Sequence, residues 1–141
     1  MGTQNGSRTL WDDIWAELTP EDLPGDLEDI ARFRGMDTAR RVVEVAGRSN
    51  LWVPKSGVGS HIDLLERHLP QDLVDAIVDD WGGSMPYIPS PDSIIGVYRE
   101  RHLLREWDGQ NEYALAQRYR LSVVQIRELI RDQMRAIQTE L

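Results

Sequence analysis

The 141-residue sequence contains no cysteine, only one lysine and one phenylalanine, and no long apolar run. Without cysteine there are no disulfides and no thiolate metal sites, which suits a protein of the reducing cytoplasm, where we expect this chain to work. No apolar stretch approaches the roughly 20 residues that a membrane-spanning helix requires, so we expect no membrane association. A composition of 40% hydrophobic and 28% charged residues is typical of one globular domain, or of two small ones.

The sequence also lacks the patterns of an enzyme or a metalloprotein. Its three histidines, His61, His68 and His102, are scattered, and no acidic or thiol cluster gives them metal-ligand spacing. There is no nucleophile elbow, phosphate-binding loop or HExxH motif. The pairs Asp12-Asp13 and Asp79-Asp80 are adjacent in sequence, and adjacent residues of a helix do not face each other. We therefore expect neither catalysis, nor a metal, nor a cofactor.

The charge is distributed unevenly along the chain. The formal net charge is −8, and residues 1–89 carry all of it, with eight basic and sixteen acidic residues. Residues 90–141 hold eight arginines and eight acidic residues. Arginine suits fork-like contacts to phosphate and guanine. A neutral DNA-binding region beside an acidic one is expected to bind DNA weakly as a monomer, which favours a dimer or a protein partner.

The N-terminal part reads as a series of short helices after eight polar residues that we expect to be disordered. An amphipathic helix is predicted over residues 9–18, with apolar residues at helical spacing: Trp11, Ile14, Trp15 and Leu18. It is expected to pack on its own domain, and the alternative is a partner-binding helix. A helix start at 19–22 is followed by a helix over 26–34 that stops at Gly35. A further helix, capped by Asp37, is expected to bury Ala39, Val42, Val43 and Ala46 before Gly47.

A repeat with an offset of 35 residues aligns 36–54 with 71–89. Each unit reads as a helix, a glycine stop, a short strand and a proline, with the first strand predicted over 50–53. Neither strand can satisfy its own backbone, so the two must pair within the chain or with a second chain across a two-fold axis. Pro86 has no N–H group, which limits the ladder.

After the first unit, a helix is predicted over 60–68, and after the second, another over 91–107. The buried face of the latter is expected to contain Ile94, Val97, Tyr98, Leu104 and Trp107. The predicted fold is mostly α. Its N-terminal helical dimerisation region, residues 1–89, contains two short β-strands, and residues 90–141 form a helix-turn-helix domain.

The helix-turn-helix is predicted at 112–131, and Asn111 is a plausible N-cap for its first helix. Its apolar positions lock two short helices across a sharp turn: Leu115, Tyr119, Leu121, Ile126 and Leu129. Ala116 lies where the helices cross, and Ser122 with Gln125 forms a capping box that marks the second helix. Arg120 occupies the turn position that is often glycine. The alternative is an ordinary helical hairpin with the same apolar pattern.

Candidate DNA contacts follow from this motif. Arg127 and Arg131 suit guanine, Glu128 suits cytosine, and Val123 and Val124 suit thymine methyl groups. Ser122 is expected on the same outward face of the second helix. Phosphate contacts are expected from Arg118, from Arg120 and from the backbone N–H groups at the helix start near Asn111. The alternative for each arginine is a solvated charge or an ion pair along the helix.

The segment 81–130 resembles the Mor/C family of phage transcription activators. The resemblance rests on Gly82-Gly83, Tyr87-Ile88-Pro89, Trp107 and the turn Asp108-Gly109-Gln110-Asn111, followed by the helix-turn-helix. The first unit looks like a second copy of the helix–strand module.

This resemblance implies a homodimer whose N-terminal helices and strands form the interface, with strands pairing antiparallel between subunits. Two helix-turn-helix domains then reach promoter DNA, and the activator recruits host RNA polymerase. The candidate dimerisation residues are Leu51, Trp52, Val53, Met85, Tyr87 and Ile88.

The leading hypothesis is therefore a dimeric, sequence-specific transcription activator of phage or prophage origin that binds double-stranded DNA. Two alternatives use the same fold without enzymatic activity. One is a phage packaging subunit, which forms a ring of many subunits. The other is a protein-interaction module whose acidic face binds a basic partner.

Overall fold

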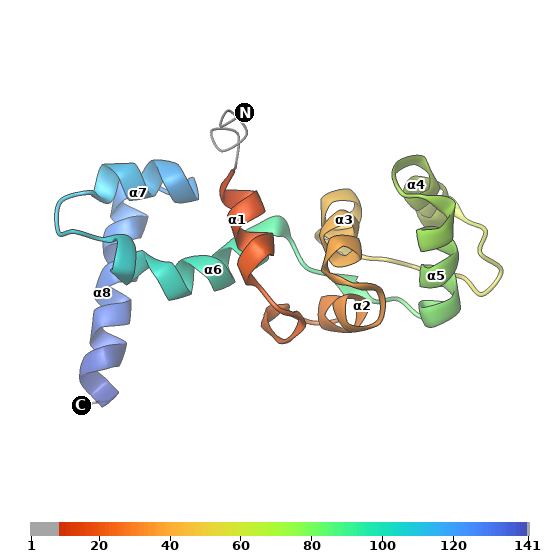
Figure 1. Ribbon diagram of the computed structural model, residues 1–141, viewed down its shortest axis with the longest axis horizontal. Coiled ribbons are helices and arrows are strands. Elements are labelled where there is room, and N and C mark those ends of the chain that lie inside the picture. Colours follow the sequence, from red (N-terminus) through yellow and green to blue (C-terminus); the bar gives the residue numbers. More distant parts are fainter. Residues whose placement is uncertain (1–8, 141) are drawn as a thin grey trace. The chain divides into compact units, whose positions relative to one another are not determined.

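The computed structural model describes residues 9–140, so the segment 1–8, for which we expected disorder, lies outside the described residues. Within that range the chain forms eight α-helices, one 3₁₀ helix and two very short strands (Figure 1). This confirms the mostly α fold with two strands. The chain divides into two compact units, which we call the N-terminal unit, Trp11–Ile94, and the C-terminal unit, whose described residues are 9–10 and 95–140.

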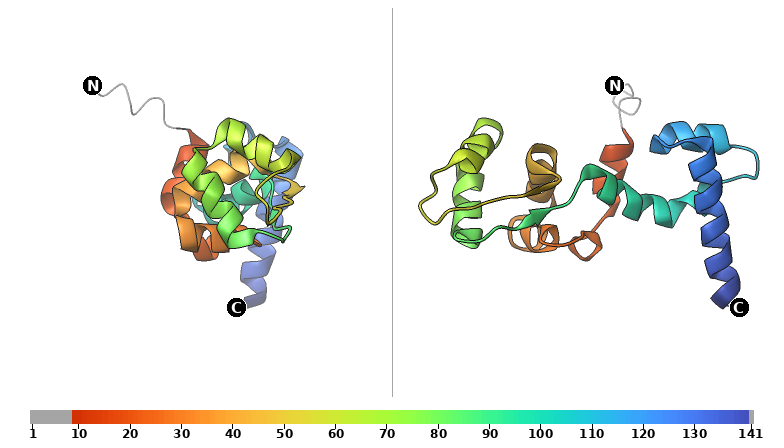
Figure 2. Two further views of the ribbon diagram at one scale, coloured as in Figure 1. Left: turned by 90° about the vertical axis from the view of Figure 1, so that its right-hand side faces the viewer. Right: turned by 180° about the vertical axis from the view of Figure 1, so that it is seen from behind.

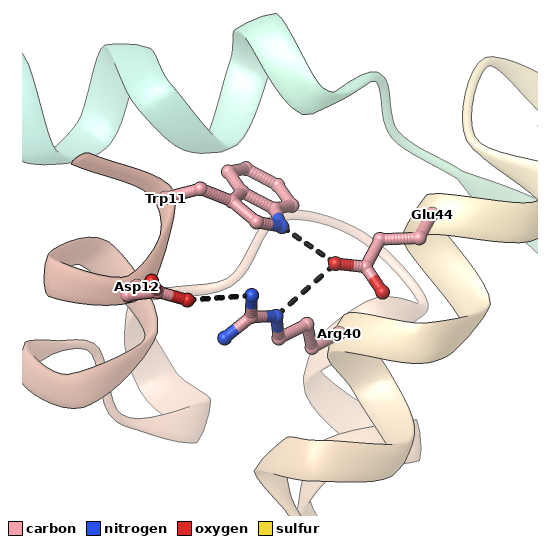
Figure 3. A network of polar contacts seen from close by, with 4 residues as sticks. All are labelled: Trp11, Asp12, Arg40 and Glu44. Atoms are coloured by element: carbon pink, nitrogen blue, oxygen red, sulfur yellow. Dashed lines mark hydrogen bonds and ion pairs between the residues drawn. The ribbon is translucent and has the colours of Figure 1, made fainter. Parts of the chain in front are cut away.

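Helix α1, Leu10–Glu17, packs on its own unit through both apolar and polar contacts. Ile14, Trp15 and the following Leu18 are buried. Trp11 Nε1 donates to Glu44 Oε2 at 2.7 Å (Figure 3). Arg40, on the same helix as Glu44, links that helix to α1. It donates to Asp12 Oδ1 of α1 at 2.8 Å and to Glu44 Oε2 at 3.1 Å (Figure 3). The apolar face of this amphipathic helix is therefore buried against its own domain.

A 3₁₀ helix, η2 at Pro20–Asp22, leads into helices α2, Leu27–Arg34, and α3, Met36–Ala46. Gly35 separates α2 from α3 with φ of 94°, a conformation that favours glycine, and so confirms the predicted stop. Helix α3 begins two residues earlier than predicted. Gly35 is its N-cap, and Asp37 lies in its first turn instead of capping it. The four residues expected to be buried in this helix are all buried: Ala39, Val42, Val43 and Ala46.

Helices α4, Ser60–His68, and α5, Gln71–Trp81, complete the N-terminal unit, and α6, Pro91–Glu106, runs from it into the C-terminal unit. In α6, Ile94 and Tyr98 are buried as expected. The predicted face is wrong at three positions, because Val97, Leu104 and Trp107 are only half-buried, whereas Leu103 is fully buried. Residues 103 and 104 are both leucine, so apolar spacing alone could not decide between them.

The two strands pair with each other inside the chain, which settles the alternative that the sequence left open. Strand β1, Ser49–Asn50, is antiparallel to β2, Tyr87–Ile88, and Val53 forms an isolated bridge with Ser84. The segments that carry them run side by side between the α2–α3 and α4–α5 helix pairs (Figure 2). The predicted strand 50–53 is wrong in its bounds, since regular pairing stops after Asn50. Leu51 N–H donates to Pro86 O at 2.9 Å, but Pro86 has no N–H to return a bond.

The pairing is symmetric under exchange of the two repeats. Ser49 pairs with Ile88, and the equivalent residues one repeat away, Ser84 and Val53, pair in the same way. The helix ends also match. Ser49 Oγ donates to Ala46 O at 2.5 Å, and Ser84 Oγ donates to Trp81 O at 2.5 Å. The N-terminal unit is thus an internal pair of helix–strand modules.

Side chains from elsewhere in the unit cap the outer edges of this two-stranded ribbon. The Trp52 N–H donates to His61 Nδ1 at 2.7 Å, and the Tyr87 N–H donates to Asp26 Oδ2 at 2.7 Å. Trp52 and Tyr87 are equivalent positions of the repeat. Strand edges that are capped in this way resist pairing with another chain.

Candidate nucleic-acid interface

The C-terminal unit contains the predicted helix-turn-helix. Helix α7, Glu112–Tyr119, is joined by a three-residue turn to α8, Val123–Glu140, and α8 continues well beyond α7 (Figure 1). Arg120 adopts the left-handed conformation, with φ of 56° and ψ of 44°, and its N–H donates to Ala116 O. Leu121 N–H donates to the same oxygen at 2.9 Å. The turn therefore keeps its left-handed residue although no glycine is present.

The capping box predicted at the start of α8 is formed in both directions. Gln125 N–H donates to Ser122 Oγ at 3.0 Å, and Ser122 N–H donates to Gln125 Oε1 at 2.9 Å. These bonds satisfy backbone donors that the first turn of a helix leaves without partners. They fix the point at which the second helix begins, and so fix which of its side chains point outward.

The two helices are locked by a small core, in which Leu115, Ala116, Tyr119 and Ile126 are buried as predicted. Leu121 is half-buried. The prediction for Leu129 is wrong, because it is only half-buried, whereas its neighbour Ile130 is 5% exposed. Ile130 lies one helical turn after Ile126, so both side chains fall on the face of α8 that packs on α7.

Glu106, at the end of α6, holds α7 in place from outside the motif. Its Oε1 accepts from Tyr119 Oη at 2.9 Å and from Arg118 Nε at 3.0 Å. The turn between α6 and α7 is closed by Asn111, whose Oδ1 accepts from the Asp108 N–H and whose Nδ2 donates to Glu106 O. Phosphate contacts were expected from Arg118 and from the backbone N–H groups near Asn111. In the structure both side chains hold α6 and α7 together.

Tyr119 is expected to make the stability of this unit sensitive to alkaline pH. Burial raises its pKa above the ordinary value of 10, Arg118 opposes this, and the Glu106 carboxylate raises the pKa further. Because the folded state favours the protonated phenol, this contribution is complete below pH 10 and is lost as the pH rises further. Tyr119→Phe is expected to cost about 1.5–3 kcal/mol at pH 7, through its lost hydrogen bond to a charged group, and to flatten the alkaline decline.

Urea unfolding of the variant between pH 7 and pH 11, followed by circular dichroism, tests this expectation. Tyr113→Phe is the matched control, because Tyr113 lies on the same helix and is 75% exposed. An alkaline decline in Tyr119→Phe as steep as that of the parent protein would contradict it.

The outward face of the turn and of α8 carries exposed cations. Arg120, Arg127 and Arg131 are exposed, and within residues 9–140 none of them is in an ion pair. The ion-pair alternative for these arginines is therefore not realised among the described residues. Ser122, Val124 and Glu128 are exposed on the same part of the motif, and Val123 is half-buried. The expected contact residues other than Asn111 and Arg118 thus form one accessible surface.

Arg135 extends this surface and was missed in the sequence analysis. It follows Arg127 and Arg131 at the same four-residue spacing, and the three span about 12 Å of the helix. All three line a hollow of about 380 Å³ beside Trp107 and Ile130. The signal was available in the spacing, but Arg135 lies beyond the usual length of the motif.

Among residues 9–140 no group of three histidines, cysteines or acidic residues is placed to hold a metal ion. His61 caps a strand edge, and His102 stacks on Tyr98 with ring centroids 4.2 Å apart. None of the described helices is both long and apolar enough to cross a membrane.

A comparison with protein-family models matches residues 58–141 to the Mor transcription activator family. No curated protein and no solved structure matches the chain. The matched range covers well over half of the sequence, including the second helix–strand module and the whole helix-turn-helix. Transcription activators of this kind bind DNA and are not enzymes. The chain belongs to the Mor transcription activator family.

Proposed function

We propose that the protein binds a specific promoter site as a homodimer and activates transcription by recruiting RNA polymerase. The observation that carries this proposal is the helix-turn-helix. Three arginines on its outward face, Arg120, Arg127 and Arg131, are free of ion pairs within residues 9–140. Exposed guanidinium groups on a second helix of this kind are suited to base edges in the major groove.

In this proposal the N-terminal half of α8 lies in the major groove. Arg127 and Arg131 donate to guanine, Glu128 accepts from cytosine, and Val123 and Val124 contact thymine methyl groups. Arg120 and Ser122 hold phosphates at the turn. Asn111 and Arg118 act indirectly, because they position α7 through Glu106.

The homodimer is proposed to form through the outer face of the strand ribbon. Side chains alternate along both segments: Leu51, Val53 and Ile88 are buried in the chain's own core. The other three candidate dimerisation residues are exposed, namely Trp52 at 43%, Met85 at 54% and Tyr87 at 47%. Continuing the register places Trp52 opposite Met85, so the three form one apolar face.

We do not propose that the strand edges pair between subunits, because β1 of the first module already pairs with β2 within the chain. The family match begins at residue 58, after the first module has ended. Strand β1 of that module pairs with β2 of the matched region. The outer edges are capped by His61 and Asp26, which leaves the exposed face as the accessible surface of the ribbon.

Replacing two aromatic residues of this face is expected to dissociate the dimer. Central aromatic residues of an interface typically contribute about 2 kcal/mol or more each, so Trp52→Ser with Tyr87→Ser is expected to weaken dimerisation by roughly 10³-fold. Sedimentation equilibrium measures the dissociation constant. Val58→Ser is the control, because Val58 is 74% exposed outside this face. Equal dimerisation of parent and double variant would exclude the surface.

The function is tested by selecting duplexes from a random pool with the pure protein, then placing the selected site upstream of a promoter. We expect an imperfect palindrome with half-sites about 34 Å apart, and increased transcription by purified RNA polymerase holoenzyme. A DNA site without stimulation would indicate a repressor. A large ring without sequence selection would indicate a packaging subunit, and partner binding without DNA binding would indicate an interaction module.

A further inference from the structure

The N-terminal unit has a groove between α2 and α5 that the proposed DNA contacts and dimer face do not use. It encloses about 470 Å³ and is lined by Asp29, Phe33, Asp79, Asp80 and Trp81, which we call the acidic groove. Arg34 ties the ends of the two helices together, because its Nε and Nη2 donate to the two carboxylate oxygens of Asp80 at 2.7 and 2.9 Å. The groove therefore has two connected walls.

One wall presents an apolar side chain with no packing role in the core. Phe33, the only phenylalanine of the chain, is 70% exposed, and Trp81 across the groove is half-buried. A large aromatic side chain left this exposed beside a second aromatic residue is typical of a surface that binds another protein.

The charge of the groove favours a basic partner. Asp29 and Asp79 make no ion pair within residues 9–140, whereas the nearby cations are already paired, Arg32 with Glu28 and Arg34 with Asp80. The whole N-terminal unit, Trp11–Ile94, contains seventeen acidic and seven basic residues. Such a surface repels nucleic acid and attracts a basic partner.

The acidic character continues along α5, which gives the partner a direction. Asp79 also lines a second hollow of about 240 Å³, together with Asp75 and Glu66. Asp72, Asp75 and Asp79 recur at helical spacing on α5. A helix with an apolar residue against Phe33 and cations one turn apart matches this arrangement.

We infer that the acidic groove is the docking site for a basic amphipathic helix of the RNA polymerase holoenzyme, with an apolar anchor seated between Phe33 and Trp81. The inference rests on the proposed function, because that function makes the polymerase the partner. It adds the surface on the activator and the chemistry of the segment that is bound. Its electrostatic part also predicts that docking weakens as the salt concentration rises.

The test uses the full chain with Phe33→Ala and Asp79→Asn, compared with the matched control Val58→Ala and Asp63→Asn. Both pairs remove one exposed apolar side chain and one exposed carboxylate, and Val58 and Asp63 lie outside the groove. Circular dichroism checks folding. Three quantities are measured: affinity for the selected DNA site, transcription with purified holoenzyme, and direct binding of the holoenzyme without DNA.

The groove variant is expected to keep its DNA affinity within 2-fold while transcription and holoenzyme affinity each fall at least 10-fold. The control is expected to match the parent protein in all three. A groove variant that activates and binds the holoenzyme as well as the control overturns the inference. A parent protein that selects no DNA site overturns the proposed function. In that case, direct binding of the holoenzyme without DNA still tests whether the acidic groove is the docking site. A parent protein that fails to bind the holoenzyme overturns the docking site.

Discussion

Arg127→Ala combined with Arg131→Ala is expected to abolish selective binding to the operator while leaving the protein folded. Both side chains are exposed, and neither is in an ion pair within residues 9–140, so their removal leaves no buried charge. A bidentate contact between arginine and guanine contributes about 1–3 kcal/mol of discrimination. Two such contacts correspond to a loss of roughly 30-fold to 10⁴-fold in affinity for the selected site. Fluorescence anisotropy with labelled operator and scrambled duplexes measures both affinities.

The control separates base recognition from simple loss of charge. Arg41→Ala with Arg67→Ala removes two exposed arginines from the N-terminal unit and changes the net charge equally. We expect this control to bind the operator almost as the parent protein does. An equal loss in both double variants would assign the effect to net charge, and no loss in either would remove α8 from the DNA-binding surface.

Local signals explain why the helix-turn-helix could be predicted from the sequence. The Ser122–Gln125 capping box and the left-handed position of Arg120 depend on residues a few positions apart, and both are formed. The repeat was also visible, because the matched glycines and serines end both helices in the same way. The predicted buried position was displaced by one residue where neighbouring residues are equally apolar, as at Leu129 and Ile130.

Contacts between distant residues could not be predicted in this way. Asp26 caps the edge at Tyr87 across 61 positions, and this contact helps to decide whether the strands are free to pair with another chain. Glu106 holds Arg118 and Tyr119 from 12 and 13 positions away, outside the helix-turn-helix motif. Two arginines of the helix-turn-helix therefore acquire different roles: Arg127 on α8 is exposed, while Arg118 on α7 is bound by Glu106.

Gly47→Ala is expected to destabilise the N-terminal unit strongly, and more than the equivalent change one repeat later. Both Gly47 and Gly82 end a helix with negative φ, so the cost comes from space and not from backbone conformation. A Cβ at Gly47 would lie 2.6 Å from Val43 O, 3.1 Å from Pro91 Cδ and 3.2 Å from Pro89 O. At Gly82 it would lie 2.6 Å from Val78 O, with its next neighbour 3.4 Å away.

The two substitutions are expected to differ in cost because more neighbouring atoms must shift to accommodate the new Cβ at Gly47. Overpacking typically costs about 1–3 kcal/mol, and we expect the upper end at Gly47 and the lower end at Gly82. Each kcal/mol lowers the Tm of a unit of this size by about 4–8 °C, which differential scanning calorimetry resolves. Gly96→Ala is the control of opposite sign, because Gly96 lies inside α6 and its new Cβ would approach no atom closer than 3.6 Å.

Alanine at position 96 is expected to stabilise the protein by about 0.5–1 kcal/mol, because glycine inside a helix loses more backbone entropy on folding. Equal losses of stability at Gly47 and Gly82 would show that the contacts of the new Cβ at Gly47 with Pro89 O and Pro91 Cδ do not add to the cost. Unchanged stability at both would contradict the close approach of each new Cβ to a carbonyl oxygen of the preceding helix, Val43 O or Val78 O. The larger loss at Gly47 would show that the first module is tightly joined to the segment that begins α6.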